Sequence, residues 1–466
     1  MELRSGRRLG SPRRCRPRRC HDGDRDGDGV DRISGLPDDL LLQVLARLRC
    51  ARAAARASVL SRRWRGLWSH LPELSFREIA PDALNAALDQ VARTDLSLLD
   101  ISVSKDYRIS PAGVASLLRT AARLAPVELG LVVWGYCKDR NIPIEVPCFH
   151  RATSIKLDVR NLHLTPPAQA GQLPVLERLS MAGCTFDTGA MVSRCPRLRV
   201  LEVLDCWSLG IVKVHSTTIQ ELAVHGSAWH GGIDIVAPVL KNFTLDTHMG
   251  GDFSMSFLAP LVEDLRWSCL CNFVNVDIGQ MWRLSTLNLW KKESICRLHM
   301  NIQYHEFLPL ADRNMMQQIA QILKFSVLAL NVTTYGHVFG AMMLSVLEIF
   351  ATIQCLDLTI EQLETIDEAC PEDCPCDRLP EWRNQNISLT ALEELNMTNF
   401  KGSEHEVDFL KLLLRCAPLM KRVSVKLAPN VIPRNEGCKK ICNIFNASPS
   451  VKCYVYHSSG KKVVYA

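Results

Sequence analysis

The side chains best suited to chemistry in this 466-residue chain are its 19 cysteines and 13 histidines. The densest group is Cys370, Cys374 and Cys376, three thiols at the spacing C-x-x-x-C-x-C. Structural zinc sites usually take four ligands, often in paired C-x-x-C spacing. Because this group lacks both that pairing and an obvious fourth ligand, we predict no metal and no other cofactor.

Motifs of catalysis and nucleotide binding are missing from the sequence. The chain contains no G-x-x-x-x-G-K-[ST], no G-x-G-x-x-G and no H-E-x-x-H. Cysteine and histidine are numerous enough to leave a Cys–His nucleophile open, but nothing marks one cysteine as activated, and buried thiols are usually inert. We therefore predict no catalytic residues and a protein that is not an enzyme.

An Asp-rich stretch, residues 22–27, imitates the start of a calcium-binding loop. Such a loop needs a bidentate glutamate at its twelfth position and a helix on either side. The twelfth position is Ile33, or Gly35 in the later register, so calcium binding is excluded.

Composition excludes a membrane-spanning or secreted protein. No run reaches the roughly 18 uninterrupted apolar residues that a membrane span needs, and the closest, Ala341–Ile353, contains Glu348. The Arg-rich start lacks an apolar core, so we expect no secretory signal. The odd number of scattered cysteines favours reduced thiols, which predicts a protein of the nucleus and/or the cytoplasm.

The net charge of +6 is unevenly distributed along the chain. Residues 1–21 carry +7, residues 22–46 carry −5 and residues 47–65 carry +7, which leaves −3 for residues 66–466. A nucleic-acid-binding body should have a basic face, so we do not expect nucleic acid to be its partner. Residues 1–30 have almost no apolar content and predict a disordered tail, whose arginines are also typical of nuclear import or a nucleic-acid contact.

Residues 31–76 predict three short helices. The segment from Leu36 to Asp39 reads as a helix start, because proline is tolerated and acids are favourable in a first turn. Apolar residues then recur at helical spacing, and further helices are expected at Ala51–Ala57 and Val59–Trp68. So small a module buries too little surface to be stable alone, which favours docking onto a partner.

This stretch resembles an F-box of the plant type, carried by Leu36-Pro37-Asp38-Asp39 and Ser61-Arg62-Arg63-Trp64 at the family's separation. The resemblance implies binding to a Skp-type adaptor and, through it, to a cullin-RING ubiquitin ligase. The chain departs from the family at Arg49, where relatives often have proline, and this change would alter the turn between the first two helices. The adaptor contacts that the resemblance implies are Leu36, Pro37, Leu40, Val44, Leu48, Leu60 and Trp64.

The body of the chain has an internal period. Six segments share the pattern apolar-x-x-apolar-x-apolar, and their first positions lie 21 or 22 residues apart: Leu176, Leu198, Ile219, Leu240, Val262 and Leu284. This period lies inside the 20–29 residues of a leucine-rich repeat. Cys184 and Cys206 follow two of these segments where that pattern takes Asn or Cys, so we expect them to fill the turn after the strand.

Alternation within each segment is a strand signal, which places the apolar positions on one face and the x positions on the other. One predicted column of exposed positions comprises Ser180, Glu202, Ala223, Thr244, Arg266 and Asn288. A second, beside it, comprises Arg178, Glu221, Asn242 and Asp264. We predict that these residues bind the target protein, a solvated sheet face being the alternative for any one of them. Trp267 falls on an inward position and is expected in the core.

Weaker strand candidates extend the array on both sides at irregular spacing. They are Leu98–Val103, Val127–Val133, Ile155–Val159, Val327–Val332 and Leu356–Ile360.

Near the end of the chain, Cys374-Pro375-Cys376-Asp377 and Trp382 are followed by Leu392-Glu393-Glu394-Leu395 and a helical segment up to Pro418. This stretch resembles the FBD region of many plant F-box/leucine-rich-repeat proteins. Ser403 and Glu406 have the spacing of a capping box, and an apolar-faced helix follows until Pro418. Strands are expected at Leu392–Met397 and Lys421–Leu427.

The sequence thus predicts an α/β protein: a small three-helix F-box module, a leucine-rich-repeat solenoid and a C-terminal α/β cap. The predicted domains are a tail at 1–30, an F-box at 31–76, the solenoid at 77–370 and an FBD-like region at 371–466. The predicted function is that of a substrate-recognition subunit of a Skp–cullin–F-box ubiquitin ligase, with an unknown target protein. The alternative is a non-catalytic scaffold or nuclear regulator that does not engage the ligase.

Overall fold

A computed structural model defines the fold, and every structural statement concerns the residues that it describes. These are residues 35–135, 142–168, 171–208, 210–229, 231–249, 253–271, 281–305, 315–361, 374, 376, 380–431 and 436–463. The predicted tail at 1–30 lies outside them. Within them, no helix is long and apolar enough to cross a membrane.

The chain begins with a small helical module. Two of its three predicted helices are confirmed as α1 (Asp38–Ala46) and α2 (Ala51–Arg56). The predicted third helix is wrong, because three short 3₁₀ turns replace it: η1 (Ala57–Val59), η2 (Arg62–Trp64) and η3 (Leu67–His70). The physical reason is that Ser61 is extended and Gly66 is left-handed at φ 79°, and neither conformation continues a helix.

The turn between α1 and α2 contains Arg49 in the left-handed region, at φ 48°. Proline is fixed near a φ of about −65° and cannot adopt this conformation. The departure from the family's proline therefore accompanies a turn that proline could not form.

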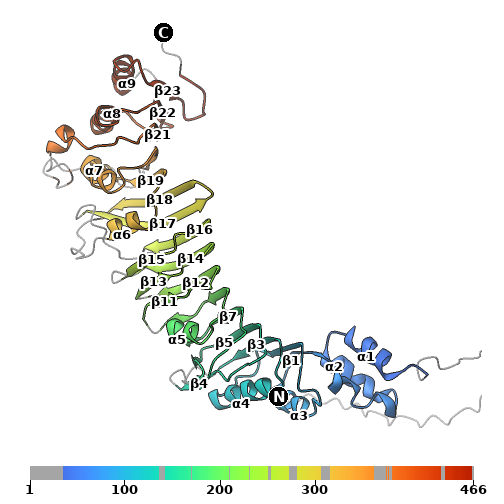
Figure 1. Ribbon diagram of the computed structural model, residues 1–466. Coiled ribbons are helices and arrows are strands. Elements are labelled where there is room, and N and C mark those ends of the chain that lie inside the picture. Colours follow the sequence, from blue (N-terminus) through green and yellow to red (C-terminus); the bar gives the residue numbers. More distant parts are fainter. Residues whose placement is uncertain are drawn as a thin grey trace, which may run out of the picture.

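A 16-stranded sheet forms the body of the molecule, and its strands lie side by side in the order of the chain (Figure 1). All its pairings are parallel except those of β17, which is antiparallel to both neighbours. The strands are β1 (Glu73–Ile79), β2 (Leu98–Val103), β3 (Glu128–Trp134), β5 (Ser154–Arg160), β7 (Arg178–Ala182), β9 (Val200–Leu204), β12 (Glu221–Trp229), β14 (Asn242–Met249), β16 (Asp264–Cys271), β17 (Trp282–Lys292), β18 (Ile295–Tyr304), β19 (Val327–Thr333), β20 (Cys355–Glu361), β21 (Glu394–Phe400), β22 (Arg422–Leu427) and β23 (Lys452–Tyr456). All five weaker strand candidates are among them.

Five of the six segments with the predicted period are parallel strands of this sheet. β7, β9, β12, β14 and β16 pair in register, so that a row of buried residues runs from Leu179 through Leu222 to Leu265. The sixth segment, Leu284–Leu289, is a strand, but it runs in the opposite direction. Its place as a sixth parallel repeat is therefore wrong, because apolar alternation has the same period of two in both strand directions.

Helices and short strands cover one side of the long sheet, on the outside of the bend in Figure 1. Two minor sheets lie in the middle, one of β4 (Pro143–Glu145), β6 (His163–Thr165), β8 (Thr185–Phe186) and β10 (Trp207–Ser208), the other of β11 (Val212–His215), β13 (Gly232–Val236) and β15 (Ser254–Leu258). The helices are α3 (Pro81–Asp89), α4 (Pro111–Arg123), α5 (Thr188–Ser193), α6 (Met315–Ile322), α7 (Gly340–Ile349), η6 (Pro380–Asn384), α8 (Glu404–Cys416) and α9 (Glu436–Asn446). One hydrophobic core runs between the layers.

The strand–helix–strand unit predicted near the C-terminus is confirmed as β21, α8 and β22. β20 and β21 pair in parallel, with Leu358 opposite Met397. The long sheet therefore continues without a break across the predicted boundary between residues 370 and 371.

The capping box of α8 is confirmed and centres on Glu406, whose side chain is buried. Its Oε2 accepts hydrogen bonds from the backbone N–H groups of Lys401, Gly402 and Ser403, at 3.0, 2.7 and 3.0 Å. Burial raises the pKa of Glu406, while these hydrogen bonds oppose the shift. One carboxylate thus accepts hydrogen bonds from three backbone N–H groups in the turn that leads from β21 into α8.

Replacing this carboxylate should destabilise the protein. Glu406→Ala leaves three backbone donors without their acceptor, so we expect a loss of roughly 1.5–3 kcal/mol in the free energy of unfolding. Urea denaturation followed by circular dichroism measures it. The exposed Glu404, on the same helical turn, provides the control Glu404→Ala, and equal stability of the two variants would contradict the assigned role.

Candidate functional site

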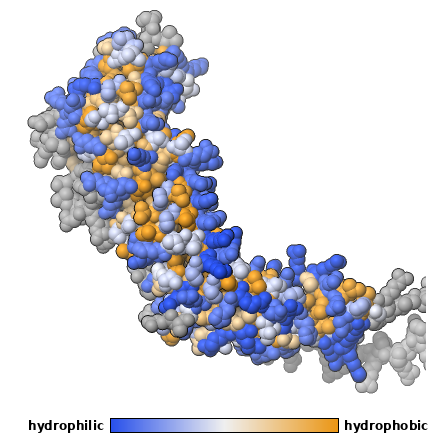
Figure 2. All heavy atoms as spheres, viewed as in Figure 1, coloured by the Kyte–Doolittle hydropathy of each residue, from blue (hydrophilic) through white to orange (hydrophobic). Residues whose placement is uncertain are grey.

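The helical module carries a group of large apolar side chains that are exposed to solvent. In α1, Leu41 and Leu45 enter the core, whereas Leu40 and Val44 lie one turn apart on the outside. Five large apolar side chains of the module are between 41% and 88% exposed: Leu40, Val44, Leu48, Val59 and Leu60. Figure 2 shows hydrophobic residues gathered at this end of the molecule. Contiguous exposed apolar side chains are typical of surfaces that contact another molecule.

The structure sorts the predicted adaptor contacts into two groups. Leu40, Val44, Leu48 and Leu60 are exposed, Pro37 is also exposed, and Leu36 is partly buried against the core. Trp64 differs, because only 7% of it is exposed and it packs inside the module. The structure therefore gives Trp64 a packing role.

Sequence reasoning missed Val59, which is 88% exposed. The expected helix at Val59–Trp68 gave no reason to place the side chain of Val59 on the surface. Its position next to Leu60 in an Arg-rich stretch was the available signal.

The two sequence motifs of the module meet through an ion pair. Asp38, at the start of α1, accepts from the Nη2 and Nε groups of Arg63 at 2.8 Å. Both side chains are well exposed, and such surface pairs contribute little to stability. The pair joins η2 to the first turn of α1 across 25 residues of sequence.

The register of the strands confirms that most residues within each predicted column lie on adjacent strands. Ser180, Glu202, Ala223, Thr244 and Arg266 pair across adjacent strands in that order. The second column is also continuous from Glu221 through Asn242 to Asp264, and Arg178 joins it through Val200.

Asn288 does not extend the first column. Because β17 is antiparallel, Trp290 lies opposite Arg266, and Asn288 lies opposite Ser268. The prediction that Asn288 follows Arg266 is therefore wrong.

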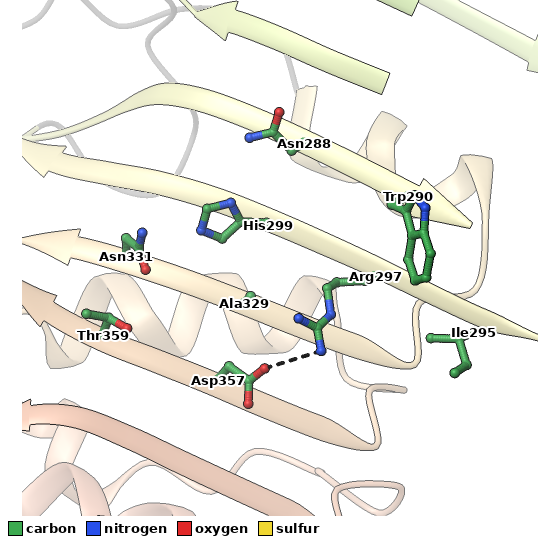
Figure 3. Close-up of a pocket in the computed structure, with 9 residues that line it drawn as sticks. All are labelled: Asn288, Trp290, Ile295, Arg297, His299, Ala329, Asn331, Asp357 and Thr359. Carbon is green, nitrogen blue, oxygen red and sulfur yellow. Dashed lines mark ion pairs between the residues drawn. The ribbon is translucent and has the colours of Figure 1, made fainter. Parts of the chain in front are cut away.

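Asn288 instead begins a row that crosses the next strands. It lies opposite His299, which pairs with Ala329, and Ala329 pairs with Asp357. The small side chain of Ala329 lies between the larger side chains of His299 and Asp357, which leaves space over the sheet. A hollow with a volume of about 720 Å³ lies at this position. Its lining residues are Asn288, Trp290, Ile295, Arg297, His299, Ala329, Asn331, Asp357 and Thr359 (Figure 3).

The hollow combines an exposed indole with a pair of opposite charges. Trp290 is 39% exposed, and Arg297 Nη2 lies 3.7 Å from Asp357 Oδ2. Asp357 is held by Asn396, whose Nδ2 donates to Oδ1 at 2.8 Å. Tryptophan and arginine dominate the energetics of protein interfaces, so this hollow has the composition of a recognition site.

Eight of the nine lining residues were not predicted. Seven of them lie on β18, β19 and β20, outside the regular part of the period, and Trp290 lies on β17, whose reversal shifts the outward positions. The exposed Trp290, two residues after the last predicted position, was the signal in the sequence.

The cysteines that are described carry no disulfide. Cys184 and Cys206 are buried with their Sγ atoms 3.6 Å apart, and Cys206 Sγ donates to the Met181 carbonyl, which confirms that they fill the turn after the strand. The hydrogen bond with Cys206 and burial raise the pKa of Cys184, and burial raises the pKa of Cys195 to about 12. Such thiols are poor nucleophiles at neutral pH.

Comparison with known proteins gives a class to the helical module. Residues 33–76 match the family model of the F-box domain. Curated relatives in Arabidopsis thaliana include a putative F-box/LRR-repeat protein, 26% identical over 306 residues, which covers 64% of this chain and 58% of the relative. A putative F-box/FBD/LRR-repeat protein is 26% identical over 272 residues, covering 54% and 61%, and an F-box/LRR-repeat protein is 29% identical over 223 residues, covering 46% and 47%.

The protein thus carries an F-box domain at its N-terminal end, and its homologues are plant F-box/LRR-repeat and F-box/FBD/LRR-repeat proteins. The chain spans about half to three fifths of the length of these three relatives.

The burial of Trp64 can be tested separately from binding. Trp64→Ala should lower the free energy of unfolding by about 3–5 kcal/mol, since it removes a buried aromatic side chain. Leu60→Ala removes an exposed side chain and should change stability by less than about 0.5 kcal/mol. Chemical denaturation monitored by circular dichroism compares the two, and a stable Trp64→Ala variant would refute the packing role.

Proposed function

We propose that the protein is a substrate-recognition subunit of a Skp–cullin–F-box ubiquitin ligase. The observation that carries the proposal is the set of exposed apolar residues on the F-box domain: Leu40, Val44, Leu48, Val59 and Leu60. Keeping them in water is unfavourable by roughly 25 cal/mol for each Å² of apolar surface. A Skp-type adaptor that covers them would recover this free energy and link the chain to a cullin-RING ligase.

The second part of the proposal is that the sheet-rich body is a leucine-rich-repeat solenoid with an FBD-like C-terminal cap. The period of 21 or 22 residues, the in-register strands and the names of the relatives support it. Each repeat exposes its apolar face until a neighbouring repeat stacks on it, so contacts between neighbours stabilise the array. The bare sheet face remains available to a target protein.

We place the target-binding site at the hollow over β17–β20. A target side chain inserted there would meet the indole of Trp290 and the charges of Arg297 and Asp357. The protein would act as a bridge without chemistry of its own, because tethering raises the local concentration of target lysines near the conjugating enzyme. The proposed location is the nucleus and/or the cytoplasm.

Adaptor binding should depend on the exposed residues of the F-box domain. The variant Leu40→Ala/Val44→Ala/Leu60→Ala should bind a purified Skp-type adaptor at least about tenfold more weakly, which corresponds to 1.4 kcal/mol. Isothermal titration calorimetry with the full chain measures this change. Gln43→Ala, an exposed polar position on the same helix, is the matched control.

Unchanged affinity of the triple variant would overturn the proposed ligase role. If the wild-type protein itself fails to bind any adaptor, the chain is a scaffold that does not engage the ligase.

Target capture should depend on the hollow and not on the F-box. We expect Trp290→Ala/Arg297→Glu to lose most copurifying target proteins, about tenfold or more, while adaptor binding stays unchanged. Quantitative affinity purification under proteasome inhibition measures both. Glu128→Ala, on the exposed side of β3, is the control, and loss confined to Arg266→Ala would move the target site to the first predicted column.

A further inference from the structure

We propose a zinc-binding site formed by His337, Cys374 and Cys376. The three side chains come from two segments that are 37 residues apart in the chain: the turn between β19 and α7, and the connection between β20 and β21. Their ligand atoms all lie within 4.8 Å of one another. Of the predicted thiol cluster, Cys370 lies outside the described residues, and His337 is the donor that the sequence did not reveal.

The distances suit one ion bound between the three side chains. Cys374 Sγ lies 3.3 Å from His337 Nδ1. Tetrahedral zinc, with bonds of about 2.3 Å to sulfur and about 2.05 Å to nitrogen, separates these two ligand atoms by about 3.6 Å. A shift of a few tenths of an ångström therefore brings the pair to coordination geometry.

The surroundings hold the donors in place. His337 ends a tight turn in which its N–H donates to the Thr334 carbonyl at 2.9 Å, and Tyr335 and Gly336 are both left-handed, at φ 46° and 83°. The imidazole ring stacks on Tyr304, with ring centroids 3.5 Å apart and an interplanar angle of 13°. Left-handed backbone at a non-glycine residue is costly, and it concentrates at functional sites.

A backbone donor is directed at one of the sulfur atoms. The N–H of Val338 points to Cys376 Sγ at 3.4 Å. Hydrogen bonds of this kind orient metal-bound thiolates and tune their charge. Cys374 and Cys376 are only 6% and 7% exposed, so a bound cation would neutralise thiolates that would otherwise be unfavourable inside the protein.

The donor set selects the metal. Thiolate together with imidazole suits zinc, whereas calcium and magnesium require oxygen ligands. The described residues supply three ligands, and a fourth donor, such as water, completes a tetrahedral ion. Binding would release thiol protons, so affinity should fall as the pH is lowered.

The site would fasten the C-terminal part of the sheet to its helical layer. The residues after His337 lead into α7. Phe339, which precedes the first residue of that helix, packs on Phe409 of α8 with ring centroids 5.5 Å apart. Trp382, in η6, packs so closely on Gly340 that a Cβ there would lie 2.5 Å from the indole. A zinc ion joining the β19–α7 turn to Cys374 and Cys376 would hold the segment before η6 against this packing.

The test measures zinc in the full-length protein. After purification from zinc-supplemented medium and dialysis, mass spectrometry of the metal should find about one equivalent of Zn²⁺. His337→Ala and Cys374→Ser/Cys376→Ser should each lose at least about tenfold in affinity. Cys453→Ser, which alters a partly buried thiol in β23, should keep the ion.

Two further measurements use the unaltered protein, in case a variant fails to fold. Co²⁺ exchanged for Zn²⁺ should give thiolate-to-metal charge-transfer absorption, and Zn²⁺ should protect Cys374 and Cys376, but not Cys453, from iodoacetamide. Less than a tenth of an equivalent of zinc in the wild-type protein, no such absorption or equal alkylation with and without Zn²⁺ would each overturn the proposal. Full zinc retention by folded His337→Ala and Cys374→Ser/Cys376→Ser variants would do the same.

Discussion

The body of this protein depends on one physical constraint: a single strand cannot cover its own apolar face. The row from Leu179 to Leu265 satisfies that constraint, because each buried residue lies beside the equivalent residue of the next strand. Burial of one such side chain contributes about 1.5–3 kcal/mol. The accumulated burial stabilises the long sheet, which carries the F-box domain at one end.

The exposed apolar cluster of the F-box domain and the hollow over β17–β20 have separate physical origins. The F-box residues Leu40, Val44 and Leu60 are exposed because so small a module has little core in which to hide them. The hollow over β17–β20 lies where β17 runs antiparallel to its neighbours and where the small side chain of Ala329 leaves space between larger ones. The strands from β1 to β16 lie between the F-box domain and this hollow.

Particular residues show where sequence reasoning succeeded and where it failed. The strands from β7 to β16, the capping box at Glu406 and the buried Cys184 followed from local patterns, and the structure confirms them. The expected helix at Val59–Trp68 is absent because Ser61 is extended. The helical spacing of Leu60 and Trp64 gave no sign of this conformation. Asn288 was misplaced because alternation does not encode the direction of a strand.

The sequence by itself determined the F-box domain, the repeating strands and the faces that they bury, since these depend on contacts between residues close together in the chain or separated by a constant period. Only the tertiary structure decided which distant side chains meet. The hollow joins four strands, and the cluster of His337 with Cys374 and Cys376 joins two loops. Strand direction and the path of each connection set those distances, and neither leaves a periodic trace in the sequence.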